Sequence, residues 1–361
     1  MNTNEKIDKV KEILKDKKIA IAFSGGADST LLCYLAKEVA EDVLAISYNN
    51  NVFPTGFVEF IKRRTTELGI KHEIIENNFL EIDDFIDNTP QRCFICRKLM
   101  YASIKQVAND KGYEIIVDGN NITDLTNDRP GILITYENNI LSPFIKAGLE
   151  SKEIHHYLED NHIEYSKSTT CLATRIKTNE RINENKLNRI SYCENYIQNL
   201  TGIEIIKVRE SNNQATIETE ELAKLLNLEK IDKIKNELKN VQYDKILLNI
   251  GLNPTNEELI TKNEIIEEDY QKINLNKQLP YSINIKDTLE EIKKIENQKT
   301  LKNLGKIEKI DSFEDKYIKI IIDNKNIKLF QTGKISVNNL KNKEETYNYL
   351  IKILPLIRRE L

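Results

Sequence analysis

Short apolar runs alternate with segments of helical apolar spacing through the first half of the chain. Four runs are short and apolar enough to be buried strands, and they cover residues 19–22, 43–48, 72–75 and 114–117. Helical spacing begins after residue 30 and recurs over residues 57–68 and 97–110. Gly69 and Gly112 follow the last two helical segments, as is usual at helix C-termini. The alternation predicts an α/β fold, with a doubly wound parallel sheet that helices cover on both faces.

The pattern changes near residue 176, and the second half predicts smaller α+β domains. An amphipathic helix is expected over residues 183–200, followed by strands at 203–208, 215–217 and 245–250. The chain is then rich in lysine, asparagine and glutamate, and residues 276–280 predict a linker. Further strands and a last helix predict a compact C-terminal unit, in which we recognise no motif. We therefore expect three domains, at residues 1–176, 177–256 and 257–361.

The composition is that of a globular chain. Of its 361 residues 40% are hydrophobic and 30% are charged, which is enough apolar material for a core in each domain. No apolar run approaches the length of a membrane span, and residues 1–18 lack the apolar centre of a secretory signal. We therefore expect a cytoplasmic protein without a membrane partner. The net charge of −4 lacks the basic surplus of most nucleic-acid-binding proteins, so we expect no nucleic acid partner.

A glycine loop joins the first predicted strand to the helix after it, with the sequence Ser24-Gly25-Gly26-Ala27-Asp28-Ser29. A strand, a glycine turn and a helix start in this order form an anion site, because backbone N–H groups approach phosphate oxygens there. Ser24 and Ser29 offer hydroxyl donors, and Asp28 is a candidate ligand for Mg²⁺. The lysine of a Walker A loop is missing. The loop instead resembles that of the PP-loop ATP pyrophosphatases, which cleave ATP to AMP and pyrophosphate to activate an acyl or carbonyl oxygen. This resemblance implies ATP and Mg²⁺ as cofactors.

A second polar loop follows the strand at 114–117. It opens with Asp118 and Gly119 and continues through Asp124 to Arg129. Ligands of open parallel sheets bind at the carboxyl ends of the strands, so we expect this loop to meet the glycine loop in one crevice. Asp118 and Asp124 are candidates for holding Mg²⁺ or orienting a substrate. Arg129 is a candidate for gripping a phosphate or a carboxylate through two guanidinium nitrogens.

Three of the five cysteines lie in polar surroundings, and an odd total in such a chain disfavours a disulfide framework. Cys93 and Cys96 have C-x-x-C spacing just before a predicted helix, whose N-terminus and flanking cations favour thiolates. With the distant Cys171 they suit three corners of an iron–sulfur cluster. A zinc site with His72 or His162 as the fourth ligand is a second interpretation. A redox dithiol at Cys93 and Cys96 alone is a third.

Taken together, these motifs resemble the LarE family, ATP-dependent sulfurtransferases that build the nickel-pincer nucleotide cofactor. The resemblance covers residues 1–255 and leaves the C-terminal hundred residues without a role. Besides the glycine loop it rests on six motifs: Cys93-x-x-Cys96 followed by Lys98 and Tyr101, Asp118-Gly119-Asn120, Arg129-Pro130-Gly131, Ser142-Pro143, Cys171-Leu172-Ala173-Thr174-Arg175-Ile176, and Val208-Arg209 with Ala215-x-Ile217-Glu218. The chain departs from the family at Thr216, where arginine is usual, and at Asn249, where aspartate is usual.

The resemblance implies a reaction and a set of residues. ATP would adenylylate a carboxylate of pyridinium-3,5-biscarboxylic acid mononucleotide and release pyrophosphate, and sulfur would displace AMP to give a thiocarboxylate. Asp28 and Cys171 would be catalytic, and a [4Fe–4S] cluster on Cys93, Cys96 and Cys171 would deliver the sulfur. ATP would bind at Ser24, Gly25, Gly26, Asp28, Ser29, Asp118 and Gly119. The substrate would bind at Lys98, Asp124, Arg129, Arg175 and Arg209. A homo-oligomer is also implied, whereas the sulfur donor is not identified.

Three other functions stay open. In part of the family a lone cysteine at the position of Cys171 gives up its own sulfur and becomes dehydroalanine. PP-loop tRNA thiolases also combine this glycine loop with C-x-x-C and a distant cysteine, although the acidic charge of this chain counts against them. The alternative that is not an enzyme is a scaffold that binds ATP and zinc without turnover.

Overall fold

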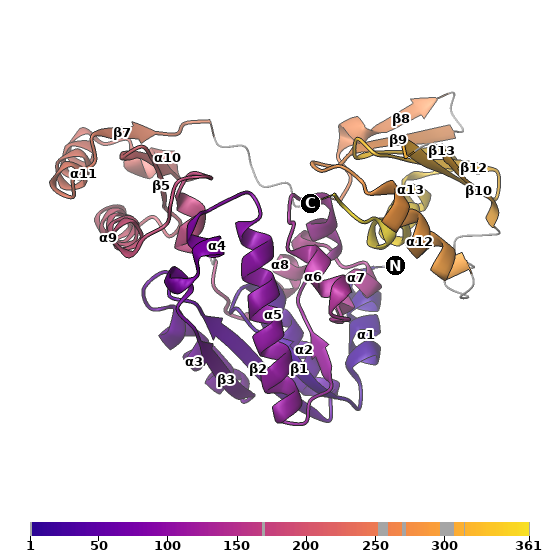
Figure 1. Cartoon of the computed structure of the whole chain (residues 1–361), viewed down its shortest axis with the longest axis horizontal. Coiled ribbons are helices and arrows are strands. Elements are labelled where there is room, and N and C mark those ends of the chain that lie inside the picture. Colours follow the sequence, from indigo (N-terminus) through magenta and orange to yellow (C-terminus); the bar gives the residue numbers. More distant parts are fainter. Residues whose placement is uncertain are drawn as a thin grey trace. The chain divides into compact units, whose positions relative to one another are not determined.

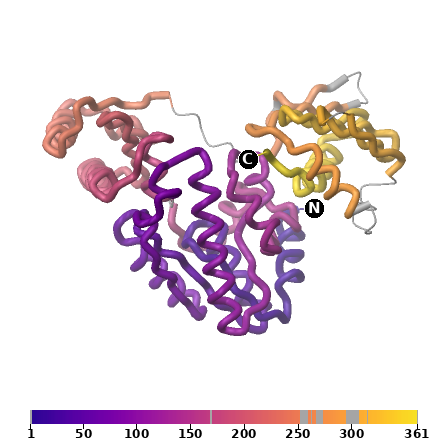
Figure 2. The backbone as a smooth tube through the Cα atoms, in the orientation of Figure 1, coloured from indigo at the N-terminus to yellow at the C-terminus, as the bar shows by residue number. Residues whose placement is uncertain are grey.

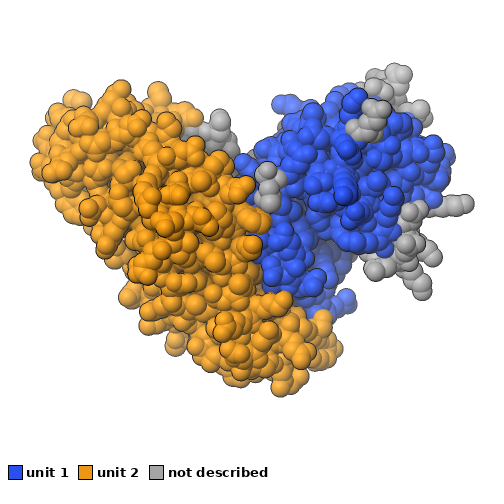
Figure 3. Space-filling view, in the orientation of Figure 1, with its two compact units in different colours: residues 1–14, 119–160, 256–361 blue, residues 15–118, 161–255 orange. Residues whose placement is uncertain are grey.

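The computed structural model describes residues 2–167, 170–251, 259–268, 272–296, 307–313 and 315–360. The chain forms two compact units, and each is discontinuous in sequence (Figure 3). Residues 15–118 and 161–255 make up the first, which we call the parallel-sheet unit. Residues 1–14, 119–160 and 256–361 make up the second, the antiparallel-sheet unit. The division into three domains at 176 and 256 stays a prediction.

A four-stranded parallel sheet forms the centre of the parallel-sheet unit, in the order β3–β2–β1–β4. The strands are β1 (Lys18–Ala22), β2 (Asp42–Asn49), β3 (Lys71–Glu76) and β4 (Ile115–Val117). The helices between them are α2 (Ala27–Val39), α3 (Phe57–Leu68), α4 (Asp83–Ile86) and α5 (Arg92–Asp110). The interiors of β1 and β2 are buried at consecutive positions, as expected for strands covered on both faces. Helix α5 packs against β2 and α2 packs against β1 (Figure 1), which confirms the predicted α/β fold.

A smaller α+β layer completes this unit. It contains α9 (Glu184–Thr201), α10 (Leu222–Leu225), α11 (Leu228–Asn240) and the sheet β5–β6–β7, with strands Lys207–Ser211, Gln214–Glu218 and Lys245–Leu248. Strands β5 and β6 pair as an antiparallel hairpin. Asn212 and Asn213 form its two-residue turn, and both have positive φ. Such a turn fixes the register and pairs Lys207 with Glu218, the last residue of β6, so β5 begins at residue 207 rather than at the expected residue 203.

The antiparallel-sheet unit contains a six-stranded sheet in the order β10–β11–β12–β13–β9–β8. Its strands are β8 (Ile265–Glu268), β9 (Lys272–Gln278), β10 (Ile307–Phe313), β11 (Tyr317–Ile322), β12 (Lys325–Phe330) and β13 (Lys334–Leu340). Burial alternates along β11 and β12, so the sheet presents one apolar face, against which α12 (Ile285–Glu296) and α13 (Lys343–Ile353) pack. The expected linker at 276–280 is wrong in its first half. Residues up to 278 belong to β9, where Lys277 is buried and paired with Glu264 at 3.0 Å.

Short helices from the first half of the chain belong to the same unit. They are α1 (Thr3–Leu14), α6 (Ile132–Glu137), α7 (Pro143–Ala147) and α8 (Ser151–Asp160), with a 3-10 turn over Ile122–Thr126. Figure 2 shows the indigo α1 beside the magenta α7. Among the described residues, none of the helices has both the length and the apolar character needed to span a bilayer.

Candidate functional site

The glycine loop turns the chain sharply from β1 into α2. Gly25 has a φ of +76°, and a Cβ built on it would lie 2.9 Å from Cε1 of Phe60 and 3.2 Å from Cγ2 of Ile61. Only glycine meets both conditions without strain. Gly26 is the N-cap of α2 and supplies no side-chain acceptor to the helix. The N–H groups of the first turn of a 13-residue helix are therefore suited to binding a phosphate.

Internal hydrogen bonds fix the shape of this loop. Ser29 Oγ is buried, accepts a hydrogen bond from Ser24 N at 3.2 Å and donates one to Gly26 O at 3.2 Å. The Ser166 N–H donates to Gly25 O at 2.9 Å, which braces the loop from outside. Ser24 is exposed and Asp28 is half-buried in the first turn of α2. Both are accessible to a nucleotide and its metal ion.

Asp118 comes directly after β4, next to β1, and its carboxylate is almost fully buried. Its Oδ2 accepts hydrogen bonds from Tyr101 Oη at 2.8 Å and from Arg97 Nη2 at 3.1 Å. Arg97 also donates to Tyr101 Oη at 3.0 Å, so helix α5 is tied to the end of β4. Burial raises the pKa of Tyr101 above its ordinary value, which keeps its hydroxyl a donor. The carboxylate of Asp118 thus holds α5 in place, in addition to its predicted role in ATP binding.

The three predicted cysteines lie near one another. Cys93 and Cys96 are the second and fifth residues of α5, which begins five residues earlier than the sequence pattern indicated. The loop after β2 contacts both cysteine segments: Asn50 Nδ2 lies 3.8 Å from Cys96 Sγ, and Val52 O accepts a hydrogen bond from Leu172 N at 2.7 Å. Arg92, next to Cys93 in sequence, donates to the backbone oxygen of Ala173, two residues after Cys171, so the three cysteines lie on neighbouring segments.

Burial opposes the thiolates that the sequence led us to expect. It is the largest effect on Cys96, whose pKa rises to about 12, and on Cys171, whose pKa also rises. Arg92 lowers both pKa values, but by less. Cys93 is exposed. Direct coordination to a metal would overcome the effect of burial on these thiols, because it deprotonates a thiol outright.

Within the described part of the chain, no group of three or more His, Cys, Asp or Glu side chains is arranged to hold a metal ion. His72 bonds instead to Ser47 Oγ at 2.9 Å and to Thr65 Oγ1 at 3.1 Å, and His162 is exposed. Neither histidine therefore completes a preformed zinc site. The three ligands of a [4Fe–4S] cluster each bind a different iron atom, so their sulfurs lie further apart than those around a single ion.

Two side chains hold the Cys171 segment against the start of α5. Arg92 Nη1 donates to Ala173 O at 3.0 Å, and its Nη2 lies 3.5 Å from Cys93 Sγ. Asn88 is fully buried with a positive φ, and its amide donates to the carbonyls of Lys177 and Glu180, both at 2.8 Å. Nothing in the sequence pattern singled out Asn88, because an asparagine before a helix is usually a solvated turn residue.

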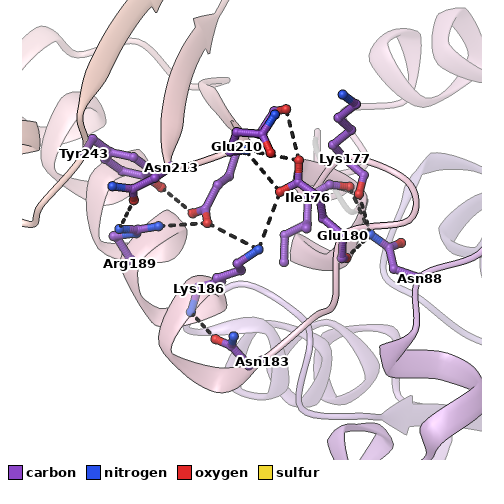
Figure 4. Close-up of polar contacts among 12 residues, drawn as sticks. Asn88, Ile176, Lys177, Glu180, Asn183, Lys186, Arg189, Glu210, Asn213 and Tyr243 are labelled. Carbon is purple, nitrogen blue, oxygen red and sulfur yellow. Dashed lines mark hydrogen bonds and ion pairs between the residues drawn. The ribbon is translucent and has the colours of Figure 1, made fainter.

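Figure 4 shows how the same segment continues into the smaller sheet. Lys177 N donates to the backbone oxygen of Glu210 at 3.0 Å. The carboxylate of Glu210 is buried and paired with Arg189 at 2.8 Å, and Tyr243 Oη donates to it at 2.9 Å. The chain that follows Cys171 is thus anchored by polar contacts to both the start of α5 and strand β5.

Arg175 and Arg209, the predicted substrate ligands of this unit, are both engaged. Arg175 is buried and donates from Nε to Glu194 at 2.8 Å. Arg209 is half-exposed and donates from Nε to Glu218 at 2.6 Å. Lys207 lies with them: its pKa is lowered first by burial, then by the charges of Arg175 and Arg209. Lys207 was not predicted from the sequence, although its alternation with Arg209 along one strand places both side chains on the same face.

Arg175 also lines a polar cleft of about 210 Å³. Its other polar walls come from Ser166 and Lys167, next to the glycine loop, from Glu204, and from Ser191, Glu194, Asn195 and Gln198 of α9. Lys98, another of the predicted substrate ligands, is exposed on α5. The cleft has the polarity and accessibility expected for binding a small charged molecule.

Asp124 and Arg129 belong to the antiparallel-sheet unit. Asp124 is buried and caps its own 3-10 turn, accepting a hydrogen bond from Asn121 N at 3.0 Å. Its other oxygen pairs with Arg129 Nη1 at 2.7 Å. Arg129 is half-exposed, so its guanidinium is accessible. The expectation that this loop and the glycine loop share one crevice stays a prediction.

A glycine loop between a parallel strand and a helix, at the centre of this sheet order, defines a PP-loop ATP-binding domain. The family profile of the PP-loop domain matches residues 1–128. The chain is 32% identical over 244 residues to the uncharacterized protein MJ0830 of Methanocaldococcus jannaschii, covering 67% of this chain and 93% of that protein. It is 28% identical over 201 residues to slr1717 of Synechocystis, covering 55% and 75%.

A characterised relative narrows the class. The chain is 24% identical over 243 residues to the pyridinium-3,5-bisthiocarboxylic acid mononucleotide synthase of Lactiplantibacillus plantarum, covering 66% of this chain and 88% of that enzyme. With the ordered motifs and the PP-loop match, these similarities identify the group. The chain belongs to the LarE family of PP-loop proteins.

Proposed function

We propose that this protein is an ATP-dependent sulfurtransferase that converts a carboxylate of pyridinium-3,5-biscarboxylic acid mononucleotide into a thiocarboxylate. One observation carries the proposal. Three thiols from two distant segments lie beside the loop after β2, and β2 neighbours the strand that ends in the glycine loop. A nucleotide site and a sulfur site at adjacent strand ends suit activation followed by sulfur transfer.

The first step is adenylation. A substrate carboxylate oxygen attacks the α-phosphate of ATP, the bond to the β-phosphate breaks, and pyrophosphate leaves. The N–H groups at the start of α2 and the hydroxyl of Ser24 would stabilise the charge on the phosphates. Asp28 would hold Mg²⁺ against the same oxygens. The carboxylate oxygen, a poor leaving group, thereby departs later as part of AMP.

The second step is sulfur transfer. Cys93, Cys96 and Cys171 would hold a [4Fe–4S] cluster, and their mutual proximity and soft sulfur donors suit it. When bound, the cluster would supply sulfide-level sulfur, so that the new C–S bond forms as the C–O bond to AMP breaks. Arg92 would keep the two cysteine segments at a constant separation. Sacrifice of the Cys171 sulfur is the runner-up, and it would not need Cys93 or Cys96.

The phosphate of the mononucleotide needs cations. Arg175, Lys207 and Arg209 form a positive group that Glu194 and Glu218 balance only in part. We propose that they bind the substrate phosphate, and that Lys98 binds another of its anionic groups. Arg129, whose guanidinium is half-exposed in the antiparallel-sheet unit, stays a proposed ligand of an anionic group of the substrate. Asn249 donates to Glu218 at 3.2 Å, so the amide at this position still orients the partner of Arg209.

Intact-mass analysis during turnover tests the mechanism. An unchanged polypeptide mass over repeated turnovers, with iron and acid-labile sulfide in the active protein, supports the cluster route. Loss of the elements of hydrogen sulfide from the chain identifies the sacrificial route. Absence of pyrophosphate release with ATP and the pyridinium substrate would overturn the proposal, and thiolation of bulk tRNA would replace it with the tRNA thiolase function.

We also propose that the protein forms a homo-oligomer through its smaller α+β layer. Several large apolar side chains are exposed there, with Leu228 at 83%, Ile250 at 77% and Leu226 at 64%. Such a group on one small layer is typical of a covered surface. Light scattering of Leu228→Lys measures the effect: a smaller particle than wild type supports the interface, and an unchanged mass removes it.

A further inference from the structure

Residues 256–361 lie outside the family's motifs, yet in the antiparallel-sheet unit they share a hydrophobic core with the loop that carries Arg129. Apolar side chains from the two sequence regions pack in that core: Ile122, Leu125, Ile132, Leu279, Ile283, Leu356 and Ile357. A loop that depends on a neighbouring segment for its core takes its conformation from that segment. The C-terminal region therefore forms the support for residues 124–131.

Two polar contacts fix the loop more specifically. Tyr281 Oη donates to the backbone oxygen of Leu125 at 2.6 Å. Arg359 Nη2 pairs with Asp128 Oδ1 at 2.8 Å, immediately before Arg129 in sequence. The Arg359 guanidinium also lies 4.8 Å from the centre of the Tyr281 ring, so the two side chains support each other.

The backbones that carry these two side chains are paired. Glu360 N donates to Ser282 O at 2.9 Å, and Asn284 N donates to Arg358 O at 2.8 Å. Ile283 and Arg359 form an antiparallel bridge between these bonds. Because this pairing fixes both backbone segments, their side chains are already in place to contact the loop, and the contact is preorganised.

We propose that Tyr281 and Arg359 are positioning residues, through which the C-terminal region holds Arg129 in the orientation that binds the substrate anion. This inference rests on the proposed function, since it assigns Arg129 to the substrate. Arg129 reaches the surface while pairing with the buried Asp124, so its direction depends on where the loop backbone lies. A displacement of about 1 Å at such a group is enough to weaken binding of a reacting molecule markedly.

Matched variants test the proposal in the full-length protein. Tyr281→Phe and Arg359→Gln each remove one contact to the loop. Tyr347→Phe removes a similar buried hydroxyl that bonds to Glu150, and Arg358→Gln removes an ion pair with Glu291 at 3.0 Å. We expect the first two variants to raise the KM for the pyridinium mononucleotide roughly three- to tenfold and to leave the KM for ATP unchanged. We expect neither control to change either KM, although all four variants should shift Tm by comparable amounts.

A double variant separates positioning from general destabilisation. In an Arg129→Gln background, Arg359→Gln should add little to the KM, because the group that it positions is gone. Independent, multiplying effects of the two substitutions would overturn the proposal. So would equal KM increases in the two tyrosine variants.

Hydrogen exchange gives a readout that needs no turnover. Amides of residues 124–131 should exchange faster in Tyr281→Phe and Arg359→Gln than in wild type, and at wild-type rates in the two controls. Unchanged exchange in the first pair overturns the inference whatever the activity. Faster exchange in a protein that transfers no sulfur would instead reject the proposed function and keep the loop contact.

Discussion

Arg92 Nη1 and the backbone oxygen of Ala173 are 3.0 Å apart, although 81 residues separate them in the chain. The same guanidinium contacts Asn88 and lies 3.5 Å from the sulfur of Cys93. It therefore connects the first turn of α5 directly to the segment that carries Cys171. The separation of the two cysteine segments is set by hydrogen bonds rather than by a covalent link, and Arg92 is the side chain that contacts both segments directly.

Replacing Arg92 should uncouple sulfur transfer from ATP activation. Arg92→Gln removes the donors to Ala173 O and Cys93 Sγ and should cost about 1–3 kcal/mol of stability, as for other part-buried charged hydrogen bonds. We expect sulfur transfer to fall at least about tenfold while pyrophosphate release stays near wild type. Parallel assays of thiocarboxylate and pyrophosphate check this. Equal losses of both products would show that Arg92 acts on the whole fold.

Gly25→Ala should abolish ATP binding for two separable reasons. The positive φ at this position costs about 1 kcal/mol for any L side chain, and the new Cβ would clash with Phe60 and Ile61. Gly56→Ala is the matched control, because its φ is +84° and no atom lies within 4 Å of the added Cβ. Calorimetric titration with ATP should show binding by Gly56→Ala and none by Gly25→Ala. Equal affinities would mean that the loop tolerates a different shape.

The order of elements in the first half was predictable because a buried parallel strand has an unmistakable apolar run. Residues 19–22 and 43–48 lie within β1 and β2, and the glycine loop joins β1 to α2 as expected. Boundaries set by polar contacts were not predictable. The turn before Arg92 and the pairing of residues 276–278 depend on partners far away in the sequence.

The same distinction applies to the site. The family resemblance implied Cys93, Cys96 and Cys171 as one group, whereas their spacing alone also allowed a dithiol of Cys93 and Cys96 without Cys171. They did not predict that Asp118 is engaged by Arg97 and Tyr101, or that Lys207 lies with Arg175 and Arg209. Those relationships arise from which helix face meets which strand end, and one-dimensional spacing does not contain that information.

His72 predicts a loss of stability on the acid side of neutrality. Burial lowers its pKa below the ordinary 6.5, so the folded state favours the neutral ring and the unfolded state binds more protons. The contribution of His72 to the free energy of unfolding should therefore be largest above pH 6.5 and decrease as the pH drops below it. His72→Gln should flatten this slope in urea titrations, whereas the exposed His162→Gln should not. An unchanged slope in His72→Gln would assign the acid sensitivity to other groups.

Alkylation of the metal-free protein should rank the cysteines by burial. Burial raises the pKa of Cys96 to about 12, so its thiol stays protonated at pH 8, whereas Cys93 is exposed. Peptide mass spectrometry after iodoacetamide treatment should find Cys93 modified first and Cys96 slowly. Asn50→Ala should not accelerate Cys96, because burial and not this contact is the main cause of its raised pKa. Equal rates at Cys93 and Cys96 would contradict the assignment.

Asp118 allows its structural and nucleotide roles to be separated. Tyr101→Phe removes one hydrogen bond to the carboxylate and should cost about 1–2 kcal/mol, since it leaves a buried acceptor with one donor fewer. Asp118→Asn should cost more, about 3 kcal/mol, because it also removes the negative partner of Arg97. In a double-mutant cycle the two effects should be far from additive, because both act on the same oxygen. If Asp118 also binds ATP, Asp118→Asn will lower the ATP affinity more than Tyr101→Phe does. Equal ATP affinities of the two variants would mean that Asp118 has only a structural role, which is to tie α5 and its two cysteines to the end of β4.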